Sequence, residues 1–326
     1  MNFPFNVYLL ALVSAATVTA MSLPLWCAWC RRTGHMDDPG HRKIHHTPIP
    51  LAGGLAVLTG LAIPLVCGAA VLYFHLFSFS TQNLALSHGL DRRGVELSAI
   101  LAGAVGMVLL GGCDDRHELR PAFKFGGQLL IALLVAAAGA RITLFVHSQI
   151  FSYAATILWM LTLVNAFNFM DNMNGLGAGL GAIGAWCFAV IAAVDGQYLV
   201  VLLALLTCGA LLGFLPFNFP KATAFLGDAG SHLTGYLLAV LAILPHFYTA
   251  ANPRPLAVLS PLLILAVPLG DLVWVVALRW RLGKPVYLGD NNHLSHRLVR
   301  AGFPPVRAVL LIWLLAAVCG ALAMAL

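Results

Sequence analysis

Charged side chains are scarce in this sequence, and their scarcity excludes a soluble globular protein. Only 9% of the 326 residues are Asp, Glu, Lys or Arg, whereas 60% are hydrophobic. Soluble domains carry roughly 25% charged residues, because polar side chains are needed to cover an apolar core. We therefore expect a lipid bilayer to be the solvent for most of the chain.

The sequence also lacks the marks of a cleaved leader and of a cysteine-based site. The first apolar segment has no basic n-region and no small-residue cleavage site after it, so we expect it to stay as a helix. Among the seven cysteines, Cys27 and Cys30 form a C-x-x-C pair. Without a second pair or a thioredoxin-like context, this pair does not indicate zinc or redox chemistry.

Long stretches without Asp, Glu, Lys or Arg locate the expected membrane spans. About 20 helical residues, rising ~1.5 Å each, are enough to cross the hydrocarbon. The pattern predicts an all-α, polytopic membrane protein with about ten transmembrane helices. We expect these at residues 5–26, 52–76, 96–113, 121–140, 150–168, 175–194, 198–216, 231–249, 256–278 and 307–326. For residues 142–151, the sequence leaves open whether they form a short strand or an interfacial element.

The basic residues indicate how the chain is oriented. If residues 27–51 are cytoplasmic and the spans alternate, 14 of the 18 Lys and Arg residues fall inside, as the positive-inside rule requires. Both termini then face outward. Eight of the 12 acidic residues and eight of the 12 histidines fall on the same side, so most side chains capable of chemistry are expected at one face.

This one-sided distribution favours an enzyme over the main alternative, an ion-coupled or lipid-linked transporter. A transporter would place its carboxylates near the bilayer midplane and would show internal repeats, and we see no obvious repeat in the sequence. A different phospholipid-headgroup transferase is a nearer alternative, but its characteristic Asp spacing is absent. We expect no nucleic acid partner, because the net charge of +6 is accounted for by membrane orientation.

The first polar segment is the loop that runs from Asp37 to Gly54. It mixes acids with basic residues and imidazoles, Lys43 and His45 among them, and three prolines stiffen it. Such a rigid loop suits phosphate binding. The simpler alternative is a basic juxtamembrane loop that touches anionic lipid headgroups.

The second polar segment is Asp114-Asp115, where the third expected helix reaches the cytoplasm. Adjacent carboxylates repel each other and are costly to desolvate. Neighbouring helical side chains point ~100° apart, so we expect the two acids to serve two partners. In the alternative, Arg116, Arg120 or Lys124 simply neutralises them.

The third and fourth segments offer oxygen ligands. Asn165, Asn168 and Asp171 recur every third residue and share one helix face, and oxygen ligands of this type suit Mg²⁺. Asn can instead join transmembrane helices by hydrogen bonds. Asp228 lies just before the eighth expected helix, either as its N-cap or as a metal ligand beside a helix N-terminus that favours phosphate.

The fifth segment contains His293, His296 and Arg297. The two histidines are three residues apart and share a helix face. With Arg297 they form a cationic, donor-rich corner for phosphate. Zinc is the alternative ligand, but the carboxylate-rich surroundings favour Mg²⁺.

In this order, the five segments resemble the polyprenyl-phosphate N-acetylhexosamine-1-phosphate transferases, a family that includes the MraY, WecA and TagO enzymes. The resemblance runs from about residue 36 to about residue 300, and five separated motifs in order make it specific. The Arg42-Lys43-x-His45 segment is similar to the WecA and TagO branch rather than to the branch that uses a peptide-bearing muramic sugar. We expect residues 1–326 to form a single integral membrane transferase domain.

The resemblance implies a role for each matching residue. Asp114 and Asp115 match an acidic pair implicated in lipid-phosphate binding and catalysis, with Asp171 as a third catalytic candidate. The implied metal-binding residues are Asn168, Asp171 and Asp228. The implied nucleotide- or phosphate-binding residues are Lys43, His45, Lys124, Asn165, Phe225, His293, His296 and Arg297.

The implied reaction transfers a sugar-1-phosphate, GlcNAc-1-phosphate first, from a UDP-N-acetylhexosamine to undecaprenyl or another polyprenyl phosphate and releases UMP. Mg²⁺ is the implied cofactor, with Mn²⁺ as a substitute. The implied setting is cell-envelope polysaccharide synthesis, at the cytoplasmic face of the bacterial inner membrane. The sequence leaves open the sugar, the polyprenyl length, a homodimer, and a covalent intermediate. We favour direct attack, because a phosphate monoester with a second pKa near ~6 is largely dianionic at neutral pH.

Several positions depart from the family pattern. Asn172 and Asn174 stand where Gly and Asp are usual, and Ser295 stands where one of two adjacent histidines is common. His232 stands where a small or apolar residue is commoner. These departures bear on sugar specificity more than on the reaction.

Overall fold

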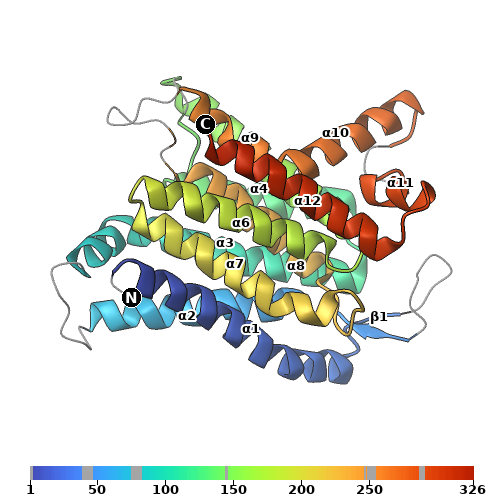
Figure 1. Cartoon of the computed structure of the whole chain (residues 1–326), viewed down its shortest axis with the longest axis horizontal. Helices are drawn as coiled ribbons and strands as arrows, with labels where there is room; N and C mark the ends of the chain where they lie inside the picture. Colours follow the sequence, from blue (N-terminus) through green and yellow to red (C-terminus); the bar gives the residue numbers. More distant parts are fainter. Residues whose placement is uncertain are drawn as a thin grey trace.

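A computed structural model gives the arrangement of the chain. It describes residues 3–38, 47–74, 83–143, 146–245, 247, 255–285 and 291–326, with the backbone alone for 83–91. Two residues expected to bind phosphate, Lys43 and His45, lie outside the described residues. The described chain is almost entirely helical (Figure 1), which confirms the all-α class.

Most helices follow the expected spans to within a few residues, but α3 begins at Asn83 rather than at residue 96 and has non-helical backbone angles at Arg93. The long ones are α1 (Phe5–Thr33), α2 (Gly53–Tyr73), α3 (Asn83–His117), α4 (Pro121–Ala137), α5 (Gln149–Met170), α6 (Leu176–Val194), α7 (Tyr198–Asn218), α8 (Gly227–Ile243) and α12 (Pro305–Met324). Between α8 and α12 lie η1 (Pro255–Leu259), α9 (Ser260–Ile264), α10 (Ala266–Arg281) and α11 (Leu294–Arg300). The strands β1 (Met36–Asp37) and β2 (Ile49–Pro50) pair antiparallel between α1 and α2. Residues 141–143 and 146–148 are irregular.

The ninth expected span, residues 256–278, is not one straight helix. Instead, the segments before and after Leu265 meet at a bend of 67°. Pro268 accounts for this break, because proline has no N–H and its ring clashes with the carbonyl four residues earlier. That carbonyl belongs to Ile264, the last residue of α9. As a result, α10 splays away from α12 (Figure 1).

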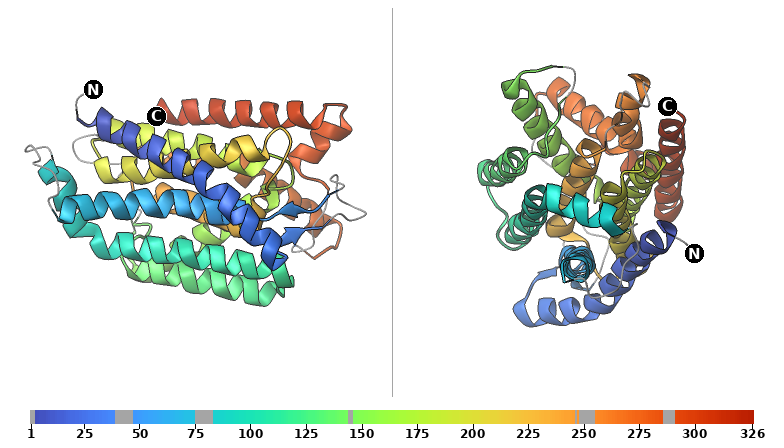
Figure 2. Two further views of the ribbon diagram at one scale, coloured as in Figure 1. Left: turned by 90° about the horizontal axis from the view of Figure 1, so that it is seen from below. Right: turned by 90° about the vertical axis from the view of Figure 1, so that its left-hand side faces the viewer.

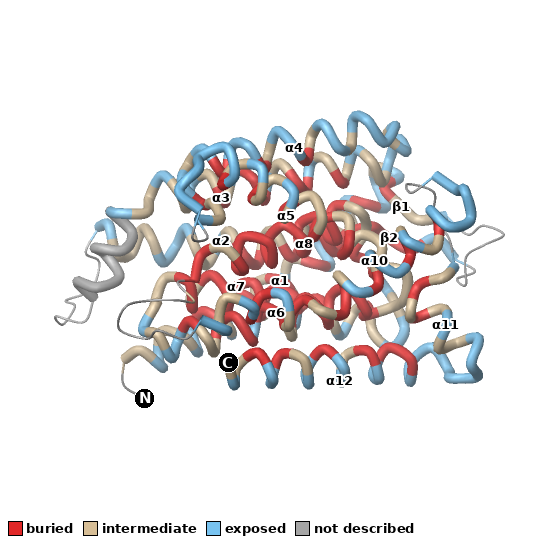
Figure 3. Tube along the Cα trace, turned by 90° about the horizontal axis from the view of Figure 1, so that it is seen from above, coloured by how far each residue is buried: buried red, intermediate tan, exposed pale blue. Residues whose placement is uncertain are grey.

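The centre of the bundle is α8, in which 14 of 17 residues are buried. It packs against α2, α3, α5 and α6, and the buried segments concentrate there and on the neighbouring α6 and α7 (Figure 3). Small residues along α8 let its neighbours approach closely. The first turn of α8 is therefore held in place by several helices at once.

The outer faces of the bundle carry large apolar side chains. Leu10, Leu130 and Ile150 are 67%, 68% and 84% exposed. Exposure of such large apolar side chains is unfavourable in water but not in lipid. Within the described ranges, seven helices are long and apolar enough to cross a membrane, and the bent pair makes an eighth if it counts as one span. The protein is thus a multi-pass membrane protein.

The two ends of the bundle differ in character. Both chain termini lie at one end, whereas β1, β2 and α11 lie at the other (Figures 1 and 2). This arrangement fits the predicted orientation, in which residues 27–51 and the histidine-bearing segment share one side and the termini share the other. Which of the two sides is cytoplasmic stays a prediction from the positive charges.

Candidate active site

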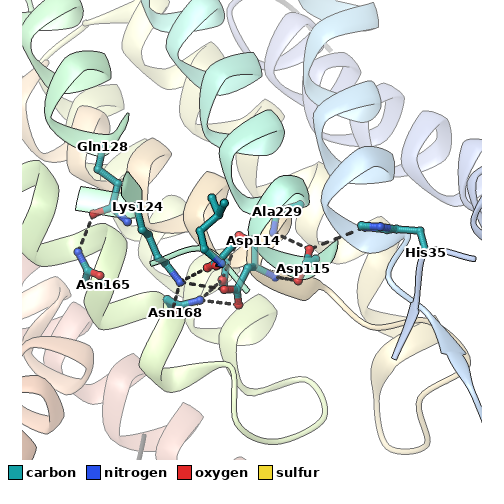
Figure 4. Close-up of polar contacts among 11 residues, drawn as sticks. His35, Asp114, Asp115, Lys124, Gln128, Asn165, Asn168 and Ala229 are labelled. Carbon is teal, nitrogen blue, oxygen red and sulfur yellow. Dashed lines mark hydrogen bonds and ion pairs between the residues drawn. The ribbon is translucent and has the colours of Figure 1, made fainter. Parts of the chain in front are cut away.

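Four helix ends meet at the end of the bundle opposite the termini. Asp114 and Asp115 lie in the last turn of α3, Lys124 lies at the start of α4, Asn168 lies at the end of α5, and Asp228 lies in the first turn of α8. Figure 4 shows most of these side chains converging. Because α3 and α5 both pack on α8, and α4 packs on both α3 and α5, residues far apart in the sequence share one polar site.

The Lys124 ammonium lies between two carboxylates. Its Nζ is 2.9 Å from Asp228 Oδ2 and also forms an ion pair with Asp114. Asn168 Nδ2 donates hydrogen bonds to Asp228 Oδ1 at 2.8 Å and to Ser231 Oγ at 3.0 Å. Lys124 therefore joins α4 to the end of α3 and to the start of α8 through two acidic side chains.

Asp115 faces a different partner from Asp114. Its carboxylate accepts hydrogen bonds from the backbone N–H groups of Asp228, at 2.7 Å, and Ala229, at 3.1 Å. Since α8 begins before Asp228, Asp228 is not the N-cap, and Asp115 satisfies the first N–H groups of α8 instead. Gly111 permits this approach, because a Cβ there would lie 2.4 Å from the Asp228 carbonyl oxygen. The adjacent acids thus have the two separate partners predicted from helix geometry.

His35 lies beside Asp115 and was not assigned a role from the sequence. Its Nε2 is 3.9 Å from Asp115 Oδ2, and both side chains are buried. Burial lowers the pKa of His35, and the positive charge of Arg116 lowers it further. His35 is therefore neutral near pH 7, and it adds no positive charge to the site.

A second polar pair lies one turn further along α4 and α5. Asn165 Nδ2 donates hydrogen bonds to Gln128 Oε1 at 2.8 Å and to the Leu161 carbonyl at 2.7 Å. Gln128 is fully buried. The pair lies next to Lys124 (Figure 4), so Asn165, expected to contact phosphate, has its amide engaged with Gln128. Gln128 was not assigned a role from the sequence.

Three side chains offer atoms suited to a metal ion. Ligand atoms of Asp114, Asp228 and His232 all lie within 4.8 Å of one another, and carboxylates and imidazoles are ordinary ligands of divalent cations. Of the expected metal-binding residues, Asp228 belongs to this group and Asn168 touches it. His232 was noted only as a departure, although its spacing of four from Asp228 places both on one face of α8.

Asp171 follows the last residue of α5 and is partly buried. Burial, together with the negative charges of Asp228 and Asp115, raises its pKa to about 8. Asp171 therefore lies within electrostatic reach of both acids. Among the described residues it is outside the group of three metal-ligating side chains, so its catalytic and metal-binding roles stay predictions.

A second polar group lies beside the end of α5, on α10 and α11. The buried Asp271 carboxylate accepts a hydrogen bond from the backbone N–H of Leu294 at 2.6 Å and lies 2.6 Å from His293 Nδ1. Because a carboxylate only accepts, His293 carries a proton on Nδ1, and Nε2 is left for a ligand. The His293 ring lies 5.9 Å from that of Phe169. Asp271 was not assigned a role from the sequence.

Two departures from the family pattern contact each other. Ser295 Oγ donates a hydrogen bond to Asn172 Oδ1 at 2.6 Å, and Asn172 Nδ2 donates to the Phe169 carbonyl at 2.7 Å. Ser295 is fully buried. This hydrogen bond ties α11 to the corner between α5 and α6. Asn174, the third departure, donates to the Pro220 carbonyl at 3.2 Å.

Three further expected residues, Arg297, His296 and Phe225, are at least partly exposed. The exposed Arg297 guanidinium stacks 4.6 Å from the centre of the Trp274 ring. His296 is partly exposed, with its ring 6.3 Å from that of His293. Phe225 precedes α8 and is partly exposed, and its backbone N–H donates to the last carbonyl of β2 at 3.0 Å.

Comparison with known proteins gives consistent matches. Residues 97–246, which span most of α3 through α8, match glycosyl transferase family 4. The decaprenyl-phosphate N-acetylglucosaminephosphotransferase of Mycobacterium leprae (strain TN) is 32% identical, over 94% of this chain and 80% of the relative. The probable undecaprenyl-phosphate N-acetylglucosaminyl 1-phosphate transferase of Bacillus subtilis (strain 168) is 30% identical, over 87% and 75% respectively.

A third relative extends the comparison. The undecaprenyl-phosphate alpha-N-acetylglucosaminyl 1-phosphate transferase of Escherichia coli (strain K12) is 28% identical, over 88% of this chain and 75% of the relative. These alignments run through the helices that carry Asp114, Lys124 and Asp228, here called the acidic group. They extend well beyond the matched family segment. The chain therefore belongs to glycosyl transferase family 4.

Proposed function

We propose that this protein transfers GlcNAc-1-phosphate from UDP-GlcNAc to a polyprenyl phosphate and releases UMP. The observation that carries the proposal is the position of Lys124, held between Asp114 and Asp228 at one end of a membrane bundle. The names of the three relatives support it, because each describes GlcNAc-phosphate transfer onto a prenyl phosphate.

Charge repulsion is the main barrier to this reaction, since both reactants are phosphate anions. The Asp114 and Asp228 carboxylates fit a divalent cation, Mg²⁺ or Mn²⁺, which when bound would neutralise charge on the diphosphate and polarise it. Lys124 is on a flexible stem beside these acids, so its ammonium can turn to a phosphate oxygen. This placement concentrates positive charge where negative charge builds up in the transition state.

A polar group on α10 and α11, formed by Asp271, His293 and Arg297 and here called the α11 group, supplies further groups for substrate binding. Asp271 holds the His293 ring with Nδ1–H toward α10, so Nε2 faces away from Asp271 and acts as a hydrogen-bond acceptor in the neutral ring. The exposed Arg297 adds guanidinium N–H donors that match phosphate oxygens. Asn168 contacts the acidic group, whereas Phe169 of the same helix end contacts the α11 group. One substrate bound across the end of α5 would therefore contact both the acidic group and the α11 group.

The acceptor phosphate needs little activation. Its second pKa is near ~6, so at neutral pH an oxygen of the lipid phosphate attacks the sugar-linked phosphorus while the bond to UMP breaks. Asp114 is the acid placed to act on that phosphate, by holding Lys124 and the proposed divalent cation beside it, because the Asp115 carboxylate is engaged with the start of α8. We propose direct attack, without a covalent intermediate on the protein.

The site is proposed to face the cytoplasm, in the bacterial inner membrane. The positive-inside rule supports this orientation, and the site lies at the end of the bundle opposite both termini. A UDP-sugar donor is a cytoplasmic metabolite in this proposal, whereas the acceptor reaches the site from the bilayer. The chain is proposed to act as one membrane domain in cell-envelope polysaccharide synthesis.

The test measures UMP release by the purified protein in detergent with UDP-GlcNAc, undecaprenyl phosphate and a divalent cation. Release should require all three, and Lys124→Met should reduce it by roughly 10²-fold or more, the usual cost of a lost transition-state donor. Lys221→Met is the matched control, because Lys221 is exposed in the loop before α8. Release that proceeds without the lipid, or survives Lys124→Met, would contradict the proposal.

A further inference from the structure

His232 occupies an unusual position in the core of the bundle. It lies on α8, four residues after Asp228, and its side chain is 0% exposed. Neither ring nitrogen has a hydrogen-bond partner among the residues that the structure describes. Buried polar groups in proteins are almost always paired, so a buried imidazole with two unpaired nitrogens needs an explanation.

The ring is directed toward the acidic group rather than toward lipid. A ring nitrogen of His232 lies within 4.8 Å of carboxylate oxygens of both Asp114 and Asp228. Lys124 is the cation between those two acids, so the surroundings of the imidazole already contain one positive charge. Burial without a hydrogen-bond partner disfavours a charged ring, and a neutral imidazole is the form that binds metals.

We infer that His232 is a nitrogen ligand of the divalent cation at this site, together with Asp114 and Asp228, and that it makes the site prefer Mn²⁺ over Mg²⁺. The inference rests on the proposed function only in placing a catalytic cation at these acids. His232 was not among the residues expected to bind metal, and a nitrogen ligand gives this chain a donor set different from an all-oxygen one.

The preference follows from ligand chemistry. Mg²⁺ takes oxygen ligands in strict octahedral geometry and gives up its waters reluctantly. Imidazole nitrogen raises affinity for transition-metal ions relative to Mg²⁺, while two carboxylates keep the site suited to a cation such as Mn²⁺. The buried position of His232 strengthens the effect, because water cannot readily replace its nitrogen.

Mn²⁺ bound to the full-length protein in detergent provides a direct test. Pulsed electron paramagnetic resonance detects ¹⁴N coupling when an imidazole nitrogen is bonded to Mn²⁺. The wild-type protein should show this coupling, and His232→Leu should abolish it and weaken Mn²⁺ binding by about tenfold or more, with a much smaller change in Mg²⁺ binding. Absence of ¹⁴N coupling in wild-type protein that binds Mn²⁺ would overturn the inference.

Two further variants test whether the His232→Leu protein is misfolded and whether another histidine supplies the nitrogen. His232→Gln keeps a polar side chain of similar size and should also lose the coupling, with size-exclusion elution unchanged. His35→Gln is the matched control, because His35 is a second buried histidine whose Nε2 lies by Asp115, and it should keep the coupling. Coupling that survives both His232 substitutions, or disappears in His35→Gln, would contradict the assignment.

The same samples separate this inference from the proposed reaction. UMP release by protein without ¹⁴N coupling would leave the transferase proposal standing and refute the metal assignment. Conversely, ¹⁴N coupling that depends on His232, in protein that releases no UMP from UDP-GlcNAc, would support the metal assignment and count against the proposed reaction.

Discussion

The Asp115 carboxylate accepts a hydrogen bond from the backbone N–H of Asp228 at 2.7 Å, which joins the end of α3 to the first turn of α8. Its second oxygen accepts from the N–H of Ala229. The neighbouring Asp114 instead pairs with Lys124. One acid of the pair therefore holds the helix that carries Asp228, and the other belongs to the polar group around Lys124.

This division predicts different effects for the same substitution at adjacent positions. Asp115→Asn leaves only one acceptor oxygen for two backbone N–H groups, so the free energy of unfolding should fall by about 1–2 kcal/mol. Asp114→Asn should abolish UMP release with a smaller change in stability. Thermal unfolding in detergent and UMP release measure the two effects, and equal unfolding of Asp115→Asn and wild type would contradict this assignment.

Asp271 is predicted to be a positioning residue that acts through His293. In Asp271→Asn, an N–H replaces the acceptor that faces His293 Nδ1, which reverses the tautomer of the ring. The kcat for UMP release should fall by about ten- to a hundredfold, since a hydrogen bond to a charged group is worth about 1.5–3 kcal/mol, while KM for UDP-GlcNAc changes less.

A double variant distinguishes this role from general loss of packing. If Asp271 acts only by orienting His293, then Asp271→Asn combined with His293→Gln should be no slower than His293→Gln alone. Independent, multiplying losses in the double variant would show that Asp271 acts by another route.

The hydrogen bond between Ser295 and Asn172 is predicted to stabilise α11 against the corner between α5 and α6. The variants Ser295→Ala and Asn172→Ala should each destabilise the protein, and the double variant should cost less than the sum of the two. A double-mutant cycle on the free energy of unfolding should give a coupling of about 0.5–1.5 kcal/mol. Additive losses would mean that the 2.6 Å contact contributes no net stability.

Asp171 is predicted to make the protein less stable as pH rises. Its pKa is raised from 3.8 to about 8, so the folded protein keeps this proton at pH values where the unfolded chain has lost it. The resulting contribution to stability is complete below about pH 4 and is lost as the pH rises through about 8. In the presence of a chelator, Tm should fall between about pH 6 and about pH 8.5, and less steeply in Asp171→Asn. Parallel pH profiles for the two proteins would contradict this account.

Much of the fold could be predicted from the sequence because the bilayer imposes one simple rule. Segments without charge became helices close to the expected ranges, from α1 to α12. The bend in the ninth span has a local cause, Pro268. A prediction based on the lack of charged residues locates the span but not the bend. The start of α8 was placed too late because Asp228 looked like an N-cap, whereas the capping carboxylate is on α3.

The candidate site was only partly predictable, since its geometry depends on contacts between distant segments. The sequence singled out Asp114, Lys124 and Asp228 as candidates, but the pairing of both acids with the Lys124 ammonium depends on how α3, α4 and α8 pack. His232 was noted only as a departure from the family pattern, because its closeness to Asp114 depends on how α3 packs on α8. Asp271 was missed because its partner, His293, is 22 positions away.

The central claim is that phosphate moves together with the sugar. UDP-GlcNAc carrying ³²P in the phosphate next to the sugar distinguishes sugar-1-phosphate transfer from transfer of the sugar alone. With undecaprenyl phosphate and a divalent cation, the label should move into the lipid extract, and the released nucleotide should be unlabelled UMP. Label that stays on UDP while GlcNAc enters the lipid would contradict the account.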